Sequence, residues 1–246
     1  MTSLETVSRQ KFDEVRIEIM RFGLRYKFAL EEIGTKVRIL QEEFRLIHDY
    51  NPIEHVSTRV KTAKSIINKA QRKNLPLRLD VIGEHIRDIA GIRIVCSFVS
   101  DIYRISEMIL AQSDIEVVEV KDYIRNPKSN GYRSLHLILK IPVFMSDRME
   151  RVYVEMQIRT IAMDFWASLE HKIYYKYNKQ VPAHLTRQLK EAADIVAELD
   201  RRMERLNEEI NILKENDAAD NAGDLLLNPR ELILQILQGG WMSEGL

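Results

Sequence analysis

The sequence has only one cysteine, no long apolar run and no excess of either charge. A single thiol, Cys96, excludes a disulfide within the chain and fits a reducing compartment, so we expect a cytoplasmic protein. No stretch of about 18 apolar residues occurs, and the acidic first residues lack an apolar run, so we expect neither a membrane span nor a secretory signal. Cys96 lies in the apolar run 92–98, where we expect it to fill the core rather than act as a nucleophile.

The 37 basic and 37 acidic side chains balance to a formal net charge of zero. Proteins that bind nucleic acid in bulk are usually basic, so we expect no stable nucleic-acid partner. The cations are instead concentrated locally, as a site for small polyanions requires. With 246 residues, 45% of them hydrophobic, the chain can form one ordinary domain with a sizeable core and helical extensions.

The hydrophobic pattern divides the chain into four parts. They are an N-terminal helical region (1–50), a core (51–180), a long C-terminal helix (181–215), and a linker with a short helical tail near Pro229 to Leu237 (216–246). Apolar residues from Phe12 to Ile47 recur every three or four positions, which predicts an amphipathic helix or a helical pair. The composition NDAADNAGD after Glu215 is typical of a linker.

Short apolar segments alternate with helical ones through the core. Strands are expected at 56–61, 89–98, 116–120, 134–143 and 152–158, and helices at 63–73, 81–87, 100–111 and 160–177. Thr62 is expected to cap the first of these helices, and Ser100 or Asp101 the third. This order predicts an α/β fold in the broad sense (α+β mixed), with a mixed β-sheet of about five strands flanked by helices and long N- and C-terminal helices.

Apolar residues of the C-terminal helix recur in four-three steps, as in a coiled-coil seam. They are Leu185, Leu189, Ala192, Val196, Leu199, Met203, Leu206, Ile210 and Leu213. The seam could pack on the chain's own body. The helix is long and its other faces are charged, so we favour a subunit interface and a homo-oligomer.

Residues 122–140, DYIRNPKSNGYRSLHLILK, carry the most informative pattern. Asn-Pro and Asn-Gly mark a tight loop that delivers Tyr132 onto an alternating strand. The basic residues around it are Arg125, Lys128, Arg133 and His136. A nucleobase can stack on an aromatic ring held beside cations that meet its phosphates. Taken alone, the segment fits a hairpin with a solvated basic rim equally well.

Three motifs resemble the synthetase domain of the RelA/SpoT family: DIAGIR at 88–93, NPKSNGYRSLH at 126–136 and EMQIRTIAMD at 155–164. The resemblance runs from about residue 26 to about 203, and DFWASLEHKIYYK at 164–176 is similar to the RelP branch of small alarmone synthetases. Family members move pyrophosphate from ATP to the 3′-hydroxyl of GDP or GTP. The resemblance implies a Mg²⁺-dependent GTP diphosphokinase that makes ppGpp and pppGpp and assembles as a homotetramer.

Phosphoryl-type transfer needs a divalent metal, a cradle of cations and a group that orients the attacking hydroxyl. By resemblance, residues matching Asp88 and Glu155 bind Mg²⁺, and Glu155 is a candidate base for the 3′-hydroxyl. Mg²⁺ prefers oxygen ligands and often takes only one or two from protein. On spacing alone, both carboxylates would be solvated surface groups.

The resemblance also implies two nucleotide sites. The ATP site comprises Arg59, Lys61, Ser65, Lys69, Arg72 and Arg93, and the GDP/GTP site comprises Lys121, Lys128, Tyr132, His136, Gln157 and Asp164. Arg59 and Arg93 would sandwich the adenine, because guanidinium planes stack well on bases. Tyr132 would stack on the guanine. Asp164 stands where some relatives have Asn, and its carboxylate can accept from guanine N1–H and the 2-amino group.

Two features limit the implied activity. The pair His48-Asp49 ends a helix with no second His and Asp at suitable spacing nearby, so we expect a synthetase without an alarmone hydrolase site. His55 and Ser57 stand where product-regulated relatives have an aromatic residue and a threonine. We therefore do not expect activation by product.

Three other functions fit parts of the sequence. A non-catalytic nucleotide or RNA sensor could use the same scaffold, but a sensor could lose Asp88 and Glu155, and both are intact. A structural helical scaffold would explain the long helices but not the motif-rich middle. Pyrophosphate transfer to another acceptor, such as an adenine nucleotide or tRNA, stays open because stacking on Tyr132 cannot separate purines.

Overall fold

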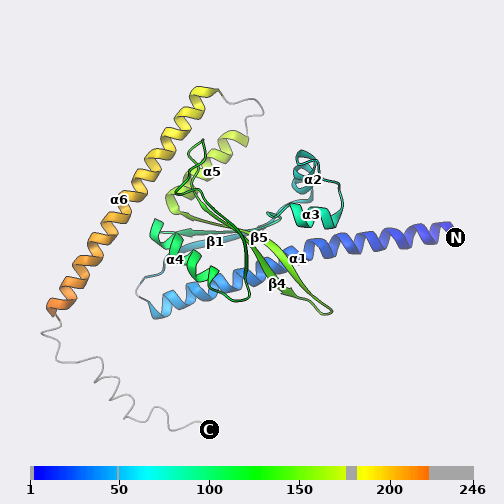
Figure 1. The fold of residues 1–246 in the computed structure, drawn as a ribbon, viewed down its shortest axis with the longest axis horizontal. Coiled ribbons are helices and arrows are strands. Elements are labelled where there is room, and N and C mark those ends of the chain that lie inside the picture. The colour runs from blue at the N-terminus through cyan, green and yellow to red at the C-terminus, as the bar shows by residue number, and fades with distance from the viewer. Residues whose placement is uncertain (1–2, 49, 176–181, 222–246) are drawn as a thin grey trace, which may run out of the picture. The chain divides into compact units, whose positions relative to one another are not determined.

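The structure is a computed structural model that describes residues 3–48, 50–175 and 182–221 (Figure 1). Its elements are α1 (Ser3–Ile47), β1 (Ile53–Val60), α2 (Ala63–Arg72), α3 (Leu79–His85), β2 (Ala90–Cys96), α4 (Val99–Leu110), β3 (Glu116–Asp122), β4 (Leu135–Phe144), β5 (Met149–Thr160), α5 (Ile161–Tyr175) and α6 (Ala183–Asn221). The expected α/β fold with a five-stranded mixed sheet and long terminal helices is confirmed. Among these residues, no helix combines the length and the apolarity needed to span a membrane.

The N-terminal pattern forms one continuous helix, α1, rather than a helical pair. Tyr26, Ile33 and Val37 recur at helical spacing, and all three are buried against the sheet. Helix α1 passes along β1, β2, β4 and β5 (Figure 1). In the half of α1 nearer the N-terminus, apolar residues such as Phe12 and Ile19 stay exposed.

One face of the sheet is apolar and carries the core. Alternate residues of the central strands, such as Ile94, Leu137 and Met156, are fully buried in one cluster with side chains from α1 and α4. Burying each side chain of this kind stabilises the fold by about 1.5–3 kcal/mol. Cys96 belongs to this cluster, and burial raises the pKa of its thiol, so its expected place in the core is confirmed.

The other face of the sheet collects the polar residues of the motifs. The strand order is β1-β2-β5-β4-β3, with β2 and β5 parallel and the other neighbours antiparallel. Residues paired across strands share a face, because side chains alternate along each strand. One row reads Ser57, Arg93, Gln157, His136 and Lys121, and the next reads Arg59, Gly91, Glu155, Ile138 and Glu119.

Two predicted helix starts can be compared with the structure. Thr62 caps α2, and its hydroxyl accepts from the backbone N–H of Ser65 at 3.3 Å, which confirms the expected cap. The expectation that Ser100 or Asp101 caps α4 is wrong, because the helix begins before both residues. Asp101 lies in the first turn of the helix, and its carboxylate accepts from the Phe98 N–H at 3.2 Å. From this position a side chain can satisfy the backbone N–H groups that have no partner within the helix.

The C-terminal helix α6 continues to Asn221, beyond the end expected at residue 215. Part of the expected linker is therefore helical, as its strong helix formers Ala218 and Ala219 favour. The rest of that segment, including the short helix expected near its end, lies outside the described residues.

The first turns of α6 pack on the chain's own body. Ala193 is buried against Trp166, and the Trp166 Nε1 donates to the carbonyl of Leu189 at 3.1 Å. Leu189 and Val196 of the predicted seam pack against the same cluster, whereas Leu199 stays 49% exposed. This part of the seam is thus divided between an intramolecular contact and an exposed edge.

The same helix fixes the loop before β4. Gly131 has a φ of +88°, and a Cβ there would lie 2.5 Å from the Cβ of Ala193. Beside it, the Arg133 guanidinium pairs with Asp194 at 3.4 Å. Only glycine both adopts this backbone conformation readily and fits against the helix.

Gly131→Ala should lower the free energy of unfolding by about 1–3 kcal/mol, because the positive φ and the Ala193 methyl both oppose a side chain. The matched control is Gly23→Ala in α1, where a methyl group meets open space. That change should raise the free energy of unfolding by about 0.5–1 kcal/mol. Urea denaturation measures both, and shifts of equal sign and size would contradict the tight contact.

Candidate active site

The polar face of the sheet carries two pockets that share Glu155. One, of about 260 Å³, is lined by Arg59 and Arg93. The other, of about 400 Å³, is lined by Asp88 and Lys69. Strand β5 lies in the middle of the sheet, so Glu155 has a neighbouring strand on each side and can face both pockets.

Asp88 lies between α3 and β2, and lysines from two other parts of the chain hold its carboxylate. Oδ2 accepts from Lys61 Nζ at 2.5 Å and from Lys69 Nζ at 2.6 Å. Burial alone would raise the pKa of Asp88, but the two ammonium groups outweigh burial and lower it, so the carboxylate is ionised at neutral pH. Its second oxygen, Oδ1, is buried and has no hydrogen-bond partner among the described residues.

Glu155 is held from both sides on the same face. Its Oε2 accepts from Gln157 Nε2 at 2.8 Å, and its Oε1 lies 3.4 Å from His136 Nδ1. Burial raises the pKa of Glu155, but His136 and Gln157 together lower it below the ordinary value. The Asp88 charge opposes this lowering, as expected for two carboxylates that line one pocket.

Two ionised carboxylates at one pocket suit a hard cation. The buried Asp88 Oδ1 lacks the partner that buried polar atoms usually have, and a metal would supply one. Within the described ranges, no group of three or more His, Cys, Asp or Glu side chains is placed to hold a metal. The donors therefore fit Mg²⁺, which often takes one or two protein carboxylates, better than a closed zinc site.

Arg59 and Arg93 reach the smaller pocket from adjacent strands. Arg59 pairs with Gly91 across β1 and β2, and a Cβ on Gly91 would lie 3.7 Å from the Arg59 side chain. The glycine of the DIAGIR motif thus leaves the space beside Arg59 open. The Arg93 guanidinium pairs with Asp164 at 3.0 Å. Ion pairing uses the N–H edge of a guanidinium and leaves its flat faces available for stacking.

Tyr132 lies among aromatic and basic side chains. Its hydroxyl is 2.8 Å from His136 Nε2, and its ring meets those of His136 and Tyr123 edge to face. The Lys128 ammonium lies 4.7 Å from the Tyr132 ring centroid and 4.6 Å from that of Tyr123. The structure thus gathers Tyr132, His136 and Lys128, and it places them beside Gln157 through the β4–β5 register.

Arg159 belongs to this group, although the motifs did not single it out. It is 4% exposed, and its guanidinium donates to Tyr132 Oη, to Gln157 Oε1 at 2.8 Å and to Asp164 Oδ1 at 3.1 Å. Glu155, Gln157 and Arg159 are two residues apart on one strand, so they share a face. That spacing, within EMQIRTIAMD, is the sequence signal that identifies it.

Three further predicted residues lie on α2 and β3. The Ser65 hydroxyl lies 2.9 Å from that of Thr62 in the first turn of α2, and Arg72 is exposed in the last turn. Neither lines either pocket in the described part of the chain. Lys121 lines the larger pocket and pairs with Glu119 at 3.0 Å.

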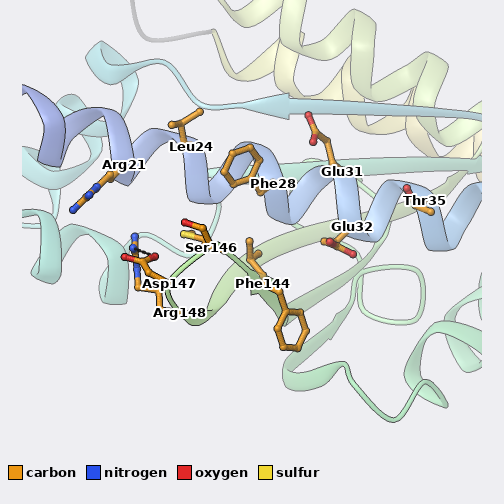
Figure 2. Close-up of a pocket in the computed structure, with 12 residues that line it drawn as sticks. Arg21, Leu24, Phe28, Glu31, Glu32, Thr35, Phe144, Ser146, Asp147 and Arg148 are labelled. Atoms are coloured by element: carbon orange, nitrogen blue, oxygen red, sulfur yellow. Dashed lines mark hydrogen bonds and ion pairs between the residues drawn. The ribbon is translucent and has the colours of Figure 1, made fainter.

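A separate groove of about 670 Å³ lies between α1 and the turn that joins β4 to β5. Figure 2 shows Phe28 between the helix and this turn, with Arg21 and Arg148 toward one end. Arg148 is already paired with Asp147 at 2.8 Å. None of the residues predicted for the nucleotide sites is among its described lining residues, so we assign the groove no part in the reaction.

Comparisons with known proteins agree with the motifs. Residues 58–180 match the family model described as the region found in RelA / SpoT proteins. GTP pyrophosphokinase YwaC of Bacillus subtilis is 54% identical over 186 residues, which cover 76% of this chain and 89% of that protein. The crystal structure of small alarmone synthetase 2 from B. subtilis has a TM-score of 0.72 and 52% identity, over 78% of this chain and 99% of that one.

Small alarmone synthetase 1 of B. subtilis, solved bound to its product pppGpp, has a TM-score of 0.73 and 39% identity, over 78% of this chain and 98% of that one. Its structure bound to AMPCPP has a TM-score of 0.67 and 36% identity, over 79% and 98%. The matched region contains all three motifs and both strand rows of the polar face, apart from Ser57. The chain therefore belongs to the RelA/SpoT family, as a small alarmone synthetase.

Proposed function

We propose that this protein is a GTP/GDP pyrophosphokinase. It transfers the β,γ-pyrophosphate of ATP to the 3′-hydroxyl of GDP or GTP, makes ppGpp or pppGpp and releases AMP. The observation that carries the proposal is the shared position of Glu155, which lines both the pocket of Arg59 and Arg93 and the pocket of Asp88. The enzyme names of the relatives, GTP pyrophosphokinases, support the same reaction.

The donor would enter from the β1 side of the sheet. Arg59 and Arg93 would sandwich the adenine between their guanidinium planes. Lys61 and Lys69, which already meet at Asp88, would face the phosphates, and charge-assisted hydrogen bonds of this kind are strong. The remaining residues of α2 in the proposed ATP site are Ser65 and Arg72.

The acceptor would bind on the β4 side, where Tyr132 stacks on the guanine. The Lys128 ammonium now lies against the Tyr132 ring, and a bound base would compete with it for that contact. Lys128 would then turn to the acceptor phosphates, together with His136 and Lys121. Gln157 would line the acceptor pocket from β5.

Asp88 and Glu155 would hold Mg²⁺, which would neutralise charge on the polyphosphate when it is bound. Glu155 would also orient or deprotonate the attacking 3′-hydroxyl. Its lowered pKa keeps it ionised at neutral pH, so it can accept a hydrogen bond from that hydroxyl. The two carboxylates favour catalysis over a non-catalytic nucleotide sensor, which would not need both.

We propose that the reaction takes place in the cytoplasm, with ATP and GDP or GTP as the partners. The unpaired and buried Cys96 fits a reducing compartment. No stable nucleic-acid partner is proposed, since the charges balance over the chain. Other acceptors, such as adenine nucleotides, are tested in the experiment below.

The direct test is incubation with labelled ATP, Mg²⁺ and each acceptor, followed by chromatography. A 3′-pyrophosphorylated guanine nucleotide and AMP are the expected products. A product formed from a different acceptor would change the assigned substrate.

Asp88→Asn and Glu155→Gln should lower synthesis at least about 100-fold while the fold persists, because each removes a charge from the proposed metal site. The control is Asp80→Asn, an exposed carboxylate paired with Arg78. Either site variant with most of its activity would refute the assigned metal site.

Tyr132→Ala should weaken use of the guanine acceptor by about 1–3 kcal/mol, the usual worth of one aromatic–base stack. The KM for ATP should change little, because the donor base is proposed to lie between Arg59 and Arg93. Steady-state kinetics with each nucleotide varied in turn measures both effects. Equal losses for donor and acceptor would show that Tyr132 supports the fold rather than the acceptor base.

We also propose a homotetramer held by the exposed edge of α6. Leu199, Met203, Leu206 and Ile210 repeat in four-three steps, and each is about half exposed. A stripe of this kind is usually covered, and closed symmetric assemblies are the common way to cover it.

Leu199→Glu combined with Leu206→Glu should therefore lower the mass measured by light scattering from that of a tetramer towards that of a monomer. The matched control is Ile212→Glu, an equally exposed residue of α6 outside the seam, which should leave the mass unchanged. A wild-type protein that is monomeric at micromolar concentration would end the proposal.

A further inference from the structure

Arg159 is a buried cation, and each of its three nitrogen atoms donates at least one hydrogen bond. Its Nε donates to Ser134 Oγ at 3.3 Å, its Nη1 to Asp164, and its Nη2 to both Tyr132 and Gln157. A buried charge is stable only when it is paired and hydrogen-bonded. Asp164 supplies the opposite charge, and the other three partners are neutral.

The partners of Arg159 close a ring of five side chains. Arg159 binds Tyr132 and Gln157, these bind His136 and Glu155 respectively, and His136 lies 3.4 Å from Glu155. The ring joins the proposed acceptor stack to the proposed base. It uses β4 and β5 only, apart from the loop residue Tyr132.

Arg159 fixes two side chains of this ring as hydrogen-bond acceptors. It can only donate, so Tyr132 Oη and Gln157 Oε1 must accept from it. Burial raises the pKa of Tyr132 above its ordinary value despite the nearby Arg159, so the hydroxyl keeps its proton and lies 2.8 Å from His136 Nε2. The Gln157 amide is likewise oriented with Nε2 towards Glu155.

The Arg159 guanidinium is also connected to the side of the sheet that is proposed to bind ATP. Asp164 Oδ1 accepts from Arg159 and pairs with Arg93, at 3.1 Å and 3.0 Å. This carboxylate pairs with two guanidinium groups, so it acts here as their shared counter-ion. Arg93 pairs with Asp164 directly, so this ion pair does not run through Arg159.

We propose that Arg159 is a positioning residue for the acceptor nucleotide: it presets the Tyr132 ring and the Gln157 amide through its hydrogen bonds to Tyr132 Oη and Gln157 Oε1. The inference rests on the proposed function for the identity of the acceptor. Lysine cannot replace it, because a single ammonium lacks the planar fork that spans Tyr132, Gln157 and Asp164 at once.

The first test is Arg159→Lys, which keeps the buried charge. The KM for GDP should rise about tenfold or more, while the KM for ATP should stay within about twofold, because Arg93 retains Asp164. The matched control is Arg151→Lys on the same strand, whose side chain is 43% exposed and which should change neither KM. Equal increases in both KM values would overturn the proposal and assign Arg159 a purely structural role.

The second test is a double-mutant cycle with Tyr132→Phe, which removes only the hydroxyl that Arg159 holds. Tyr132→Phe alone should raise the KM for GDP several-fold with no change for ATP. Adding it to Arg159→Lys should produce less than the product of the single effects, since both break one bond. Independent, multiplicative effects would overturn the proposal. If Arg159→Lys does not fold, an unchanged KM for GDP in Tyr132→Phe would do so by itself.

GDP binding measured by titration calorimetry separates this inference from the proposed reaction. If the wild-type protein binds GDP but makes no pyrophosphorylated product, the proposed function fails. Weaker GDP binding in Arg159→Lys would then still support the positioning role. A wild-type enzyme that synthesises product, with GDP binding equal in both proteins, would overturn the positioning role alone.

Discussion

The register of β5 against β2 and β4 is the constraint on which the rest of the site depends. Glu155 and Gln157 belong to two adjacent rows that cross all five strands, and each row takes one residue from each strand. Side chains alternate strictly, so a slip of one residue would turn these groups into the core and bring Met156 to the surface. The large apolar cluster on the other face opposes that slip. The same burial that stabilises the sheet therefore also aligns the residues predicted for the nucleotide sites.

Much of this arrangement could be predicted from local sequence, and the remainder depends on tertiary pairing. Alternation around Arg59 and His136, and the cap at Thr62, gave strands and helix where the structure has them. The strand order could not be predicted in this way, because periodicity carries no information on which strands are neighbours. Arg159 was overlooked for a related reason, since its importance lies in partners from a loop and a following helix.

Helix α6 packs on its own chain through its first turns and carries the proposed subunit interface on later turns. Its first turns press Ala193 against Gly131 and pair Asp194 with Arg133, so they shape the loop that carries Tyr132. The proposed subunit edge begins on the next turns, at Leu199. The three motifs lie far from this helix in sequence. If the proposed subunit interface forms, the contacts of α6 with the loop would connect it to the proposed acceptor site.

The two lysines paired with Asp88 bear on how a charged nucleotide would enter the proposed site. In the free protein, Lys61 and Lys69 both pair with one carboxylate oxygen of Asp88. Each of these three charged groups therefore has a partner of opposite charge. In the proposed reaction, an arriving ATP would offer its phosphates to the lysines and its cation to the carboxylate, so the site would exchange one set of counter-ions for another. Each charged group would therefore keep a partner of opposite charge throughout this exchange. A polyphosphate without a bound cation would compete with Asp88 for the two lysines. The Asp88 carboxylate would then lie unpaired next to the negatively charged phosphates. In the proposed reaction, the ion pair would therefore favour metal-loaded over metal-free nucleotide.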